Sequence, residues 1–426
     1  MKLDYWKTFV LGLGFFSISL SWSIYNSYVP IFLSELLKDA AYRTTLVGII
    51  MTFDNIAAIT LQPYFGALSD RTWTRIGRRM PFLAAGMPVA AVFFALIPVT
   101  KFALAAMIPV IIVMNVAMTA FRAPTVALMP DITPSPLRSK ANGVINFMGG
   151  LGALLAFFAF SQLFKISPAL PFVVTSALMV AVLFILLKTI HEPRDAGDIG
   201  GGAGADGGTE KSVGILRAMG EVVADRDKSA LCLLLAIFFW FVGWSGVEAL
   251  FTLYSVEVWG MTPAAASFVL GFFSLSFLVF AIPSGFIATT IGRRRTILAG
   301  IVGLSLVLAA MTFARPGVTL TGLLLVGGIA WALININSYP MVVDMTSAAR
   351  IGAYTGLYYF FSALAAIVAP PVFGWFMDVL GRRALFVCAF VSFVVAFALM
   401  FGVRRGEAAQ TASAEREAGA PVDAGV

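Results

Sequence analysis

The chain has 426 residues, of which 60% are hydrophobic and only 12% are charged. A soluble domain carries about 25% charged residues, and its core cannot use this much apolar sequence, so lipid must surround most of the chain. The formal net charge of +7 does not indicate a nucleic-acid-binding protein, because the basic residues punctuate apolar runs, as topogenic charges do.

Few residues are suited to metal or cofactor chemistry. Cys232 and Cys388 lie inside apolar runs and form neither a metal-binding spacing nor a disulfide framework. The single histidine, His191, follows an apolar run, so no histidine-based active site is available. The sequence contains neither a nucleophile–base pair nor a phosphate-binding loop that would indicate an enzyme. We therefore predict no cofactor, no metal site and no enzymatic activity.

Apolar runs of about 20 residues, long enough to cross a bilayer as helices, follow one another along the chain. The first begins after Lys2 and Lys7 and is longer than the core of a signal peptide, which indicates an uncleaved span. The first six runs lie near 9–33, 45–68, 81–100, 102–129, 141–164 and 169–190. The second six lie near 229–254, 262–288, 295–314, 318–343, 351–377 and 383–403.

These runs predict an all-α membrane protein with twelve transmembrane helices in two pseudo-symmetric six-helix bundles, residues 1–190 and 229–404. Residues 191–228 form the expected cytoplasmic linker, with a flexible Gly-rich part. Its residues 210–228 are compatible with a short amphipathic helix on the membrane surface. The Ala/Glu-rich tail, 405–426, is expected to be disordered and cytoplasmic.

Basic residues set the expected orientation. Arginines and lysines gather between spans 2 and 3, 4 and 5, and 8 and 9, before span 11 and after span 12, all on the side of the N-terminus. By the positive-inside rule both termini are cytoplasmic, and the expected location is the cytoplasmic (inner) membrane. Arg382 and Arg383 fall on the other side, against the rule.

The two halves repeat each other. Residues 76–79 (IGRR), after span 2, recur as residues 291–294 after span 8. Asp131 at the end of span 4 corresponds to Asp344 at the end of span 10. Internal duplication at this scale is typical of transporters that rock two halves about a site near the midplane.

The run 62–82, QPYFGALSDRTWTRIGRRMPF, is the strongest local signal. Gly66 permits close helix approach, and Asp70 ends span 2 where arginines can pair with it. Such a cluster can lock and release the cytoplasmic face, although plain topogenic charge is the alternative. The predicted cytoplasmic gate comprises Gly66, Asp70, Arg71, Arg75, Gly77, Arg78, Arg79, Asp131, Arg138, Asp344 and Arg350.

This run resembles the signature loop of the major facilitator superfamily, in the longer form Q-P-x-x-G-x-x-S-D-R-x-x-x-R-x-G-R-R-x-P-F of the sucrose–proton symporters and their bacterial relatives. Residues 122–143 are similar to the same branch, where an arginine, an acid and a later R-x-x-A-N follow in order. The C-terminal half resembles the family only in architecture. The resemblance implies the major facilitator fold and proton-coupled sugar transport. The related glycoside–pentoside–hexuronide cation symporters carry two span-2 aspartates at the positions of Ala58 and Gln62, and this departure favours protons over sodium or lithium.

Three acids are candidates for proton coupling: Asp54, Asp131 and Glu248. Asp54 lies about 24 Å from the cytoplasmic end of span 2 at 1.5 Å per residue, and intramembrane acids are functional candidates by default. The alternative is a structural acid that is hydrogen-bonded to Asn55. The resemblance places an essential acid at Asp131, whereas its duplication as Asp344 favours a gate ion pair, because an arginine follows each of them.

Sugars are bound by planar hydrogen-bonding groups and aromatic faces. Arg122 precedes Asp131 by the interval that separates Asn335 from Asp344, so we expect Arg122 and Asn335 to face each other across a cavity. Arg122 is a candidate for binding sugar hydroxyls or for pairing with Asp54. For any single aromatic residue, packing is an equally good interpretation. The candidate substrate-binding residues are Trp22, Tyr25, Asn26, Asn55, Arg122, Asn146, Trp244, Asn335, Asn337 and Tyr358.

The leading hypothesis is a proton-coupled symporter of a sugar, a disaccharide or glucoside, that works by alternating access. Its expected partners are a small-molecule substrate, protons and the lipid bilayer, with no nucleic acid, and we expect a monomer. The alternative is an exporter or flippase of an amphiphilic solute or lipid with the same fold. A membrane sensor would be expected to carry a large soluble domain.

Overall fold

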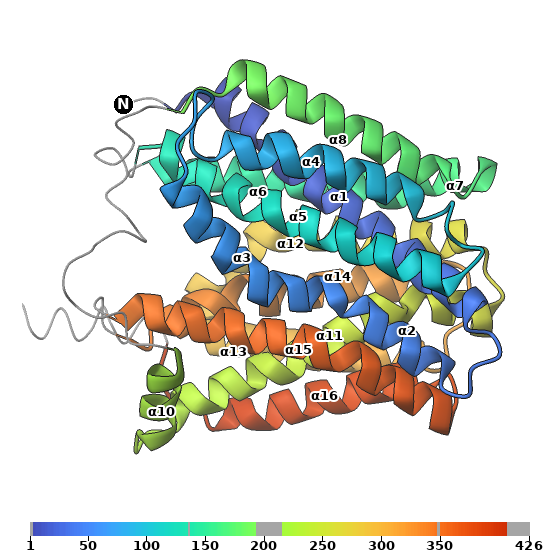
Figure 1. The fold of residues 1–426 in the computed structure, drawn as a ribbon. Coiled ribbons are helices and arrows are strands. Elements are labelled where there is room, and N and C mark those ends of the chain that lie inside the picture. Colours follow the sequence, from blue (N-terminus) through green and yellow to red (C-terminus); the bar gives the residue numbers. More distant parts are fainter. Residues whose placement is uncertain (1–2, 135–136, 193–214, 347–349, 407–426) are drawn as a thin grey trace, which may run out of the picture. The chain divides into compact units, whose positions relative to one another are not determined.

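The computed structural model describes residues 3–134, 137–192, 215–346 and 350–406, and nearly all of them are helical (Figure 1). The first half contains α1 (Tyr5–Leu36), α2 (Arg43–Met51), α3 (Phe53–Arg71), α4 (Met80–Leu96), α5 (Leu104–Ile132), α6 (Arg138–Leu155), the π-helix η2 (Ala156–Phe160), α7 (Ser161–Ile166) and α8 (Leu170–Thr189). The second half contains α10 (Ile215–Ala224), α11 (Ser229–Trp259), α12 (Pro263–Ile291), α13 (Arg293–Met311), α14 (Val318–Val343), α15 (Ile351–Leu380) and α16 (Ala384–Phe401).

The helices account for the predicted spans. Among the described residues, 11 helical segments are long and apolar enough to cross a membrane, and α4 is a shorter apolar helix that supplies the twelfth. The segment 43–71 combines α2 with α3, and the segment 140–166 combines α6, η2 and α7. The prediction of an all-α membrane protein with twelve helical spans is confirmed.

Two spans are interrupted in ways that their apolar runs do not predict. The second span breaks at Thr52, whose backbone N–H donates to the carbonyls of Gly48 and Ile49 at 3.2 Å each. The break starts α3 at Phe53 and places Asp54 in its first turn. The fifth span contains η2, a single π-helical turn, and such turns are frequent at functional sites.

By their internal contacts the residues form two compact units. The first consists of Met1–Glu210, Gly246–Ser274 and Ile367–Leu385, and the second of Lys211–Ser245, Leu275–Ala366 and Phe386–Val426. The first unit therefore joins the N-terminal half to parts of α11, α12 and α15 and to the first residues of α16. The predicted division into bundles 1–190 and 229–404 follows the sequence repeat and stays a prediction.

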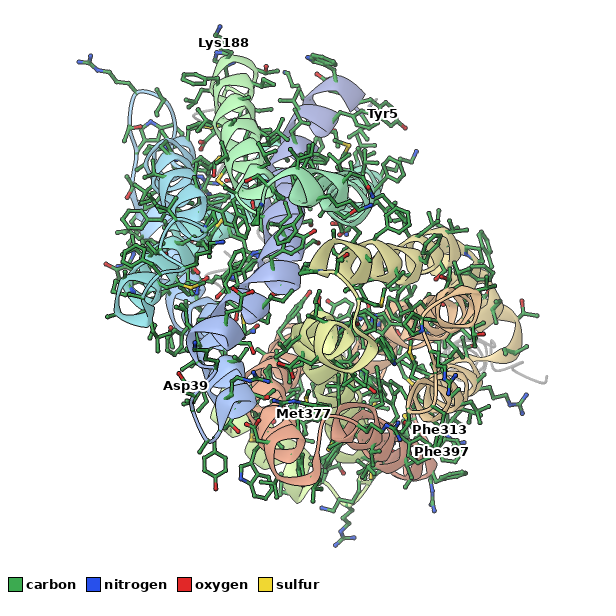
Figure 2. All side chains as sticks on the ribbon, turned by 90° about the vertical axis from the view of Figure 1, so that its right-hand side faces the viewer. Tyr5, Asp39, Lys188, Phe313, Met377 and Phe397 are labelled. Atoms are coloured by element: carbon green, nitrogen blue, oxygen red, sulfur yellow. The ribbon has the colours of Figure 1, made fainter. Side chains whose placement is uncertain are left out.

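Packing within the first unit centres on α1 and α5. The helix α1 packs against α6, α8 and α5, while α5 also packs against α3 and α4. At Gly152 the helix α6 approaches α1 so closely that a Cβ atom would lie 3.2 Å from the carbonyl carbon of Phe16. Figure 2 views this unit from the end at which α1 finishes, where Asp39 and Met377 of α15 are both labelled.

The linker and the tail lie largely outside the described residues, which end at 192, resume at 215 and stop at 406. Within the predicted amphipathic segment, α10 is helical. Val222 is buried against the protein and Val223 is exposed, so these two neighbouring apolar residues have different surroundings.

Candidate functional site

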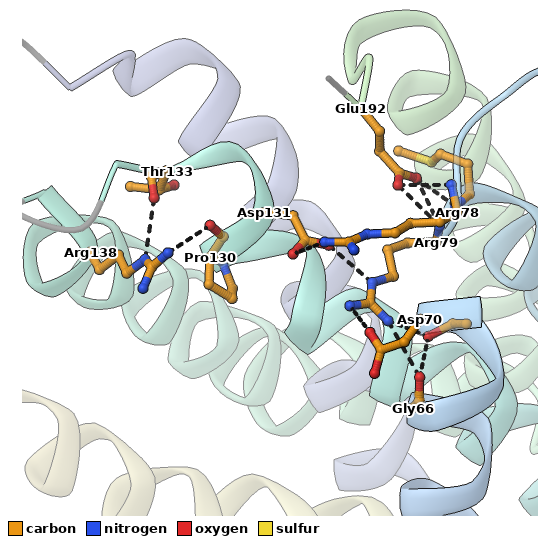
Figure 3. Close-up of polar contacts among 11 residues, drawn as sticks. Gly66, Asp70, Arg78, Arg79, Pro130, Asp131, Thr133, Arg138 and Glu192 are labelled. Carbon is orange, nitrogen blue, oxygen red and sulfur yellow. Dashed lines mark hydrogen bonds and ion pairs between the residues drawn. The ribbon is translucent and has the colours of Figure 1, made fainter. Parts of the chain in front are cut away.

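The signature loop, residues 62–82, folds around two neighbouring arginines at the start of α4 (Figure 3). Arg79 is almost fully buried, and its Nε donates to Oδ2 of Asp131 at 3.0 Å. The same guanidinium pairs with Asp70 and donates to the hydroxyl of Ser69. Arg78 donates to Oδ1 of Asp131 at 2.6 Å, so both carboxylate oxygens of Asp131 are bound by arginines.

Glu192 completes this cluster and is not among the residues predicted from the sequence. Its carboxylate accepts hydrogen bonds from the backbone N–H groups of Arg78, Arg79 and Met80, each at 2.9 Å. These groups open α4, where a negative charge is favoured. Gly77 permits the approach, since its φ is +117° and a Cβ atom there would lie 3.1 Å from the Cβ of Glu192. The available sequence signal was an acid directly after span 6, on the side that carries the arginine clusters.

The repeat in the second unit has the same kind of pair. Arg293, the counterpart of Arg78, pairs with Asp344 and also donates to the carbonyl of Pro340 at 3.3 Å. Gly292 has a φ of +94° and matches Gly77. The duplication seen in the sequence therefore extends to the turn and to the ion pair.

The arginines that follow the two aspartates in the sequence are not their partners. Arg138 donates to the carbonyls of Thr133 and Pro130 at 3.3 and 3.2 Å, and Arg350 pairs with Glu221 at 3.5 Å. The reason is local, because the end of α5 leaves carbonyl groups without helical partners and an arginine satisfies them. Arg71 and Arg75 are exposed, and neither forms an ion pair with a described residue.

Asp54 lies in the first turn of α3, next to the break in its span. Its Oδ1 accepts hydrogen bonds from the backbone N–H and the side-chain amide of Asn55, at 2.6 and 2.8 Å. Arg122 and Glu248 act on it electrostatically, yet no ion pair within 4.0 Å joins Asp54 to Arg122 in the described residues. Asp54 is thus held by one oxygen, with a cationic and an anionic group in its surroundings.

Around Asp54 the side chains of α1 and α5 form a polar layer. Tyr25 is fully buried, its ring lies edge-on to Trp22 at 5.5 Å, and it interacts electrostatically with Asp54. Asn115 on α5 is also fully buried and lies close to the Tyr25 hydroxyl, although no well-formed hydrogen bond joins its amide to a described residue. Asn26 is half-buried on α1. Asn115 is not among the residues predicted from the sequence, although a polar residue two helical turns before Arg122 shares its helix face.

The candidate residues in the second unit contact neighbouring aromatic rings, hydroxyl groups and a backbone carbonyl. Trp244 stacks on Trp331 at 5.1 Å between ring centroids. Asn337 donates to the hydroxyl of Ser284 and the carbonyl of Leu333, both at 2.9 Å, which is a structural arrangement. Tyr358 lies 3.1 Å from the hydroxyl of Ser338.

Asn335 and Asn146 differ in their exposure. Asn335 is half-buried, and its expected position opposite Arg122 stays a prediction. On α6 in the first unit, Asn146 is exposed, and its amide donates to Oδ1 of Asn142 at 3.0 Å.

Several solved structures superpose on this chain over nearly its whole length. The nucleoside transporter NupG, in a variant form, superposes with a TM-score of 0.74 at 16% identity, covering 93% of this chain and 100% of that one. A D-xylose–proton symporter superposes with a TM-score of 0.72 at 15% identity, covering 94% and 97% of the two chains. A bacterial homologue of the human lysosomal transporter Spinster, in an inward-facing and occupied conformation, gives 0.70 at 14% identity, with coverages of 94% and 97%. At these identities the likeness establishes the fold alone.

An uncharacterized symporter from Synechocystis sp. is 31% identical over 93 residues, which are 22% of this chain and 16% of that protein. The Major Facilitator Superfamily matches residues 11–370 and, in a second overlapping match, 233–424. The two matches together span nearly the whole chain, so this integral membrane protein belongs to the Major Facilitator Superfamily of transporters and has its fold.

Proposed function

We propose that this chain is a secondary active transporter that moves a sugar together with protons, with Asp54 as the coupling group. The observation that carries the proposal is the placement of Asp54 at a break in a membrane span, with one carboxylate oxygen held by Asn55 and Arg122 in electrostatic reach. Charged side chains within spans are costly and serve ion or substrate pathways.

The relatives support the part of the proposal that concerns coupled transport. One solved structure of the same fold is a D-xylose–proton symporter, and the Synechocystis relative is named as an uncharacterized symporter. The residues around Asp54 fit a polyhydroxyl solute, because Arg122, Asn115 and Tyr25 offer hydrogen-bond donors and Trp22 offers an aromatic face.

Purified protein in liposomes loaded with a pH-sensitive dye tests this proposal. Sucrose, maltose, trehalose, simple glucosides, D-xylose and nucleosides are added in turn to wild type and to Asp54→Asn. Asp39→Asn is the matched control, because Asp39 is an exposed acid outside the site. We expect one sugar to acidify the lumen with wild type and with Asp39→Asn, and not with Asp54→Asn.

The other outcomes contradict defined parts of the proposal. Acidification that persists in Asp54→Asn moves the coupling to Asp131 or Glu248. Acidification by nucleosides alone replaces the sugar. If none of the solutes moves protons, with or without sodium, the sugar symport proposal falls, and export of an amphiphilic solute becomes the better hypothesis.

A further inference from the structure

A second cluster of charges lies in the first unit, where span 2 begins. The signature loop lies at the other end of this span. Glu257, near the end of α11, binds Arg43 through Oε1 at 2.6 Å and Arg382 through Oε2 at 2.7 Å. Arg382 also binds Asp378 of α15 at 3.0 Å. These side chains are only 4–27% exposed, so most of their surface is removed from water. We call Arg43, Glu257, Asp378 and Arg382 the latch.

Asp378 ties this cluster to the backbone of α2. Its carboxylate accepts hydrogen bonds from the N–H groups of Thr44 and Thr45, at 3.2 and 2.8 Å, and from the hydroxyl of Thr45 at 2.8 Å. The residue before α2, Tyr42, supplies no side-chain cap of its own. A carboxylate of α15 therefore caps the N-terminus of α2, where the helix favours negative charge.

Two glycines bring α2 and α15 into backbone contact beside the latch. A Cβ atom at Gly374 would lie 2.5 Å from the carbonyl oxygen of Thr44 and 2.8 Å from the backbone nitrogen of Thr45. A Cβ atom at Gly48 would lie 2.7 Å from the backbone nitrogen of Pro371. The contact leaves no room for a methyl group at either position.

The sequence repeat relates this contact to a second one, in which the described residues form no ion pair. The helix α2 belongs to span 2 and α15 to span 11; the equivalent pair is span 5 with span 8, which is η2 with α12. There Phe158 lies edge-on to Phe268 and Phe272, with ring centroids 5.2 and 5.3 Å away, and Gly271 faces Phe157. One of two equivalent contacts is thus held by ion pairs and the other by aromatic packing.

We propose that the latch is the gate of the transport pathway at this end of the membrane, and that Glu257 must release both arginines before solute can pass there. The inference rests on membership of a transporter family and on no particular solute or ion. It also accounts for the position of Arg382, which contradicts the positive-inside rule. Arg382 forms ion pairs with Glu257 and Asp378 and is therefore less available to the lipid headgroups.

Ion pairs suit a contact that must form and break repeatedly. When the contact opens, water solvates the separated charges, so the lost attraction is largely offset. Removal of one partner leaves an uncompensated charge in the closed contact only, which favours the open form. Neutralising Glu257 should therefore shift the equilibrium toward opening at this end.

A cysteine at position 27 reports the opening directly. In the structure the Ser27 side chain is buried, and its hydroxyl lies 3.3 Å from that of Ser267 on α12. The reporter Ser27→Cys is placed in a Cys232→Ser, Cys388→Ser background, and the rate of labelling by a membrane-impermeant maleimide is measured in vesicles of known orientation. We expect Glu257→Gln to raise labelling from the latch side about tenfold, equivalent to about 1.4 kcal/mol in the opening equilibrium.

A second variant disturbs the same contact without removing a charged side chain. Gly374→Ala should also raise labelling of Ser27→Cys, because its methyl group prevents closure. The matched controls are Asp39→Asn, an exposed acid outside the latch, and Gly322→Ala, where an added Cβ meets nothing within 4 Å. Both controls should label at the wild-type rate.

A buried reporter in the bundle core separates opening from unfolding. Ala90→Cys, fully buried on α4, should stay unlabelled in every variant. If it becomes labelled with Glu257→Gln, that variant is unfolding and Gly374→Ala decides. Wild-type labelling of Ser27→Cys in folded Glu257→Gln or Gly374→Ala would overturn the inference. Because the assay needs neither sugar nor a proton gradient, it can succeed where the proposed function fails, and the reverse.

Discussion

The hydrogen bonds of Asp54 alone do not decide whether this acid couples transport to protons or only stabilises the structure. Asn55 binds one carboxylate oxygen through its backbone and its side chain, as a structural acid would require. The other oxygen has no hydrogen bond from a described residue, and Arg122 acts on the carboxyl without forming an ion pair. A carboxyl that is only half satisfied can still change its protonation state during a cycle.

Variants at the two neighbouring positions separate these roles. We expect Asp54→Asn to lower proton-driven accumulation of solute by about tenfold or more. Exchange of solute in counterflow should continue, because exchange needs no net proton movement. Asn55→Ala should lower accumulation less than Asp54→Asn does, because the backbone N–H of residue 55 can still bind Asp54. Radiolabelled uptake and counterflow in the same liposomes provide both measurements. Equal loss in the two variants would make Asp54 a structural acid.

Asn115 offers a test of function against stability. A buried polar group without a well-formed hydrogen bond costs about 1–3 kcal/mol, so Asn115→Leu should leave the melting temperature unchanged or raise it. If Asn115 contributes to the solute site, transport should nevertheless fall. Thermal unfolding in detergent and uptake in liposomes are measured on the same preparation, with Asn142→Leu on the exposed face of α6 as the control. A stabilised variant with normal uptake would remove Asn115 from the site.

At the scale of elements, the ends of α3, α4 and α5 meet at Arg79, which pairs with Asp70 and Asp131. Removing one partner of a buried ion pair costs about 3–5 kcal/mol, because the remaining charge stays desolvated. Asp131→Asn should therefore open this cluster and lower the melting temperature strongly. Arg138→Gln, which loses only two bonds to carbonyls, should have a much smaller effect. Thermal unfolding of both variants compares them, and equal losses would indicate that Arg138 and Asp131 pair during the cycle.

The start of α11 gives a pH-dependent prediction. Hydrogen bonds from the hydroxyl and backbone N–H of Ser229, together with Arg405, hold the pKa of Asp227 below its ordinary value of 3.8. Because the folded-state pKa is the lower one, the stabilisation is present above pH 3.8 and is lost as the pH falls through the folded-state pKa.

We therefore expect Asp227→Ala to lower the melting temperature at pH 7, and the gap to wild type should shrink below about pH 4. Melting curves of both proteins across this range measure it. A gap that stays constant down to the lowest pH would show that the carboxylate charge contributes nothing.

The helices were predictable because apolar runs of membrane length leave few alternatives. The breaks at Thr52 and η2 were not, since the apolar pattern continues through both. The sequence also indicated that Asp131 and Asp344 form ion pairs, but proximity in sequence suggested Arg138 and Arg350 in place of Arg78 and Arg293. Tertiary contact decides which of several arginines is the partner. The same holds for Glu192 and Glu257, which are unremarkable acids until the chain is folded.

At the scale of the whole molecule, the unequal distribution of positive charge predicts which end of the spans faces the cytoplasm. The signature loop has exposed Arg71 and Arg75 and further arginines in ion pairs. At the other end, Arg43 and Arg382 are bound by acids of the latch, so the exposed positive charge there is reduced. The exception that Arg382 made to the positive-inside rule is thereby weakened, and the rule predicts a cytoplasmic signature loop.

Single-cysteine labelling in the Cys232→Ser, Cys388→Ser background tests this orientation in intact cells. Arg75→Cys, exposed in the signature loop, should react with a membrane-impermeant maleimide only after the cells are permeabilised. Lys101→Cys, exposed between α4 and α5, should react without permeabilisation. The reverse pattern would place both termini outside and make the latch the cytoplasmic gate. The contacts of Glu257 would be unchanged, but the side from which the gate admits solute would be exchanged.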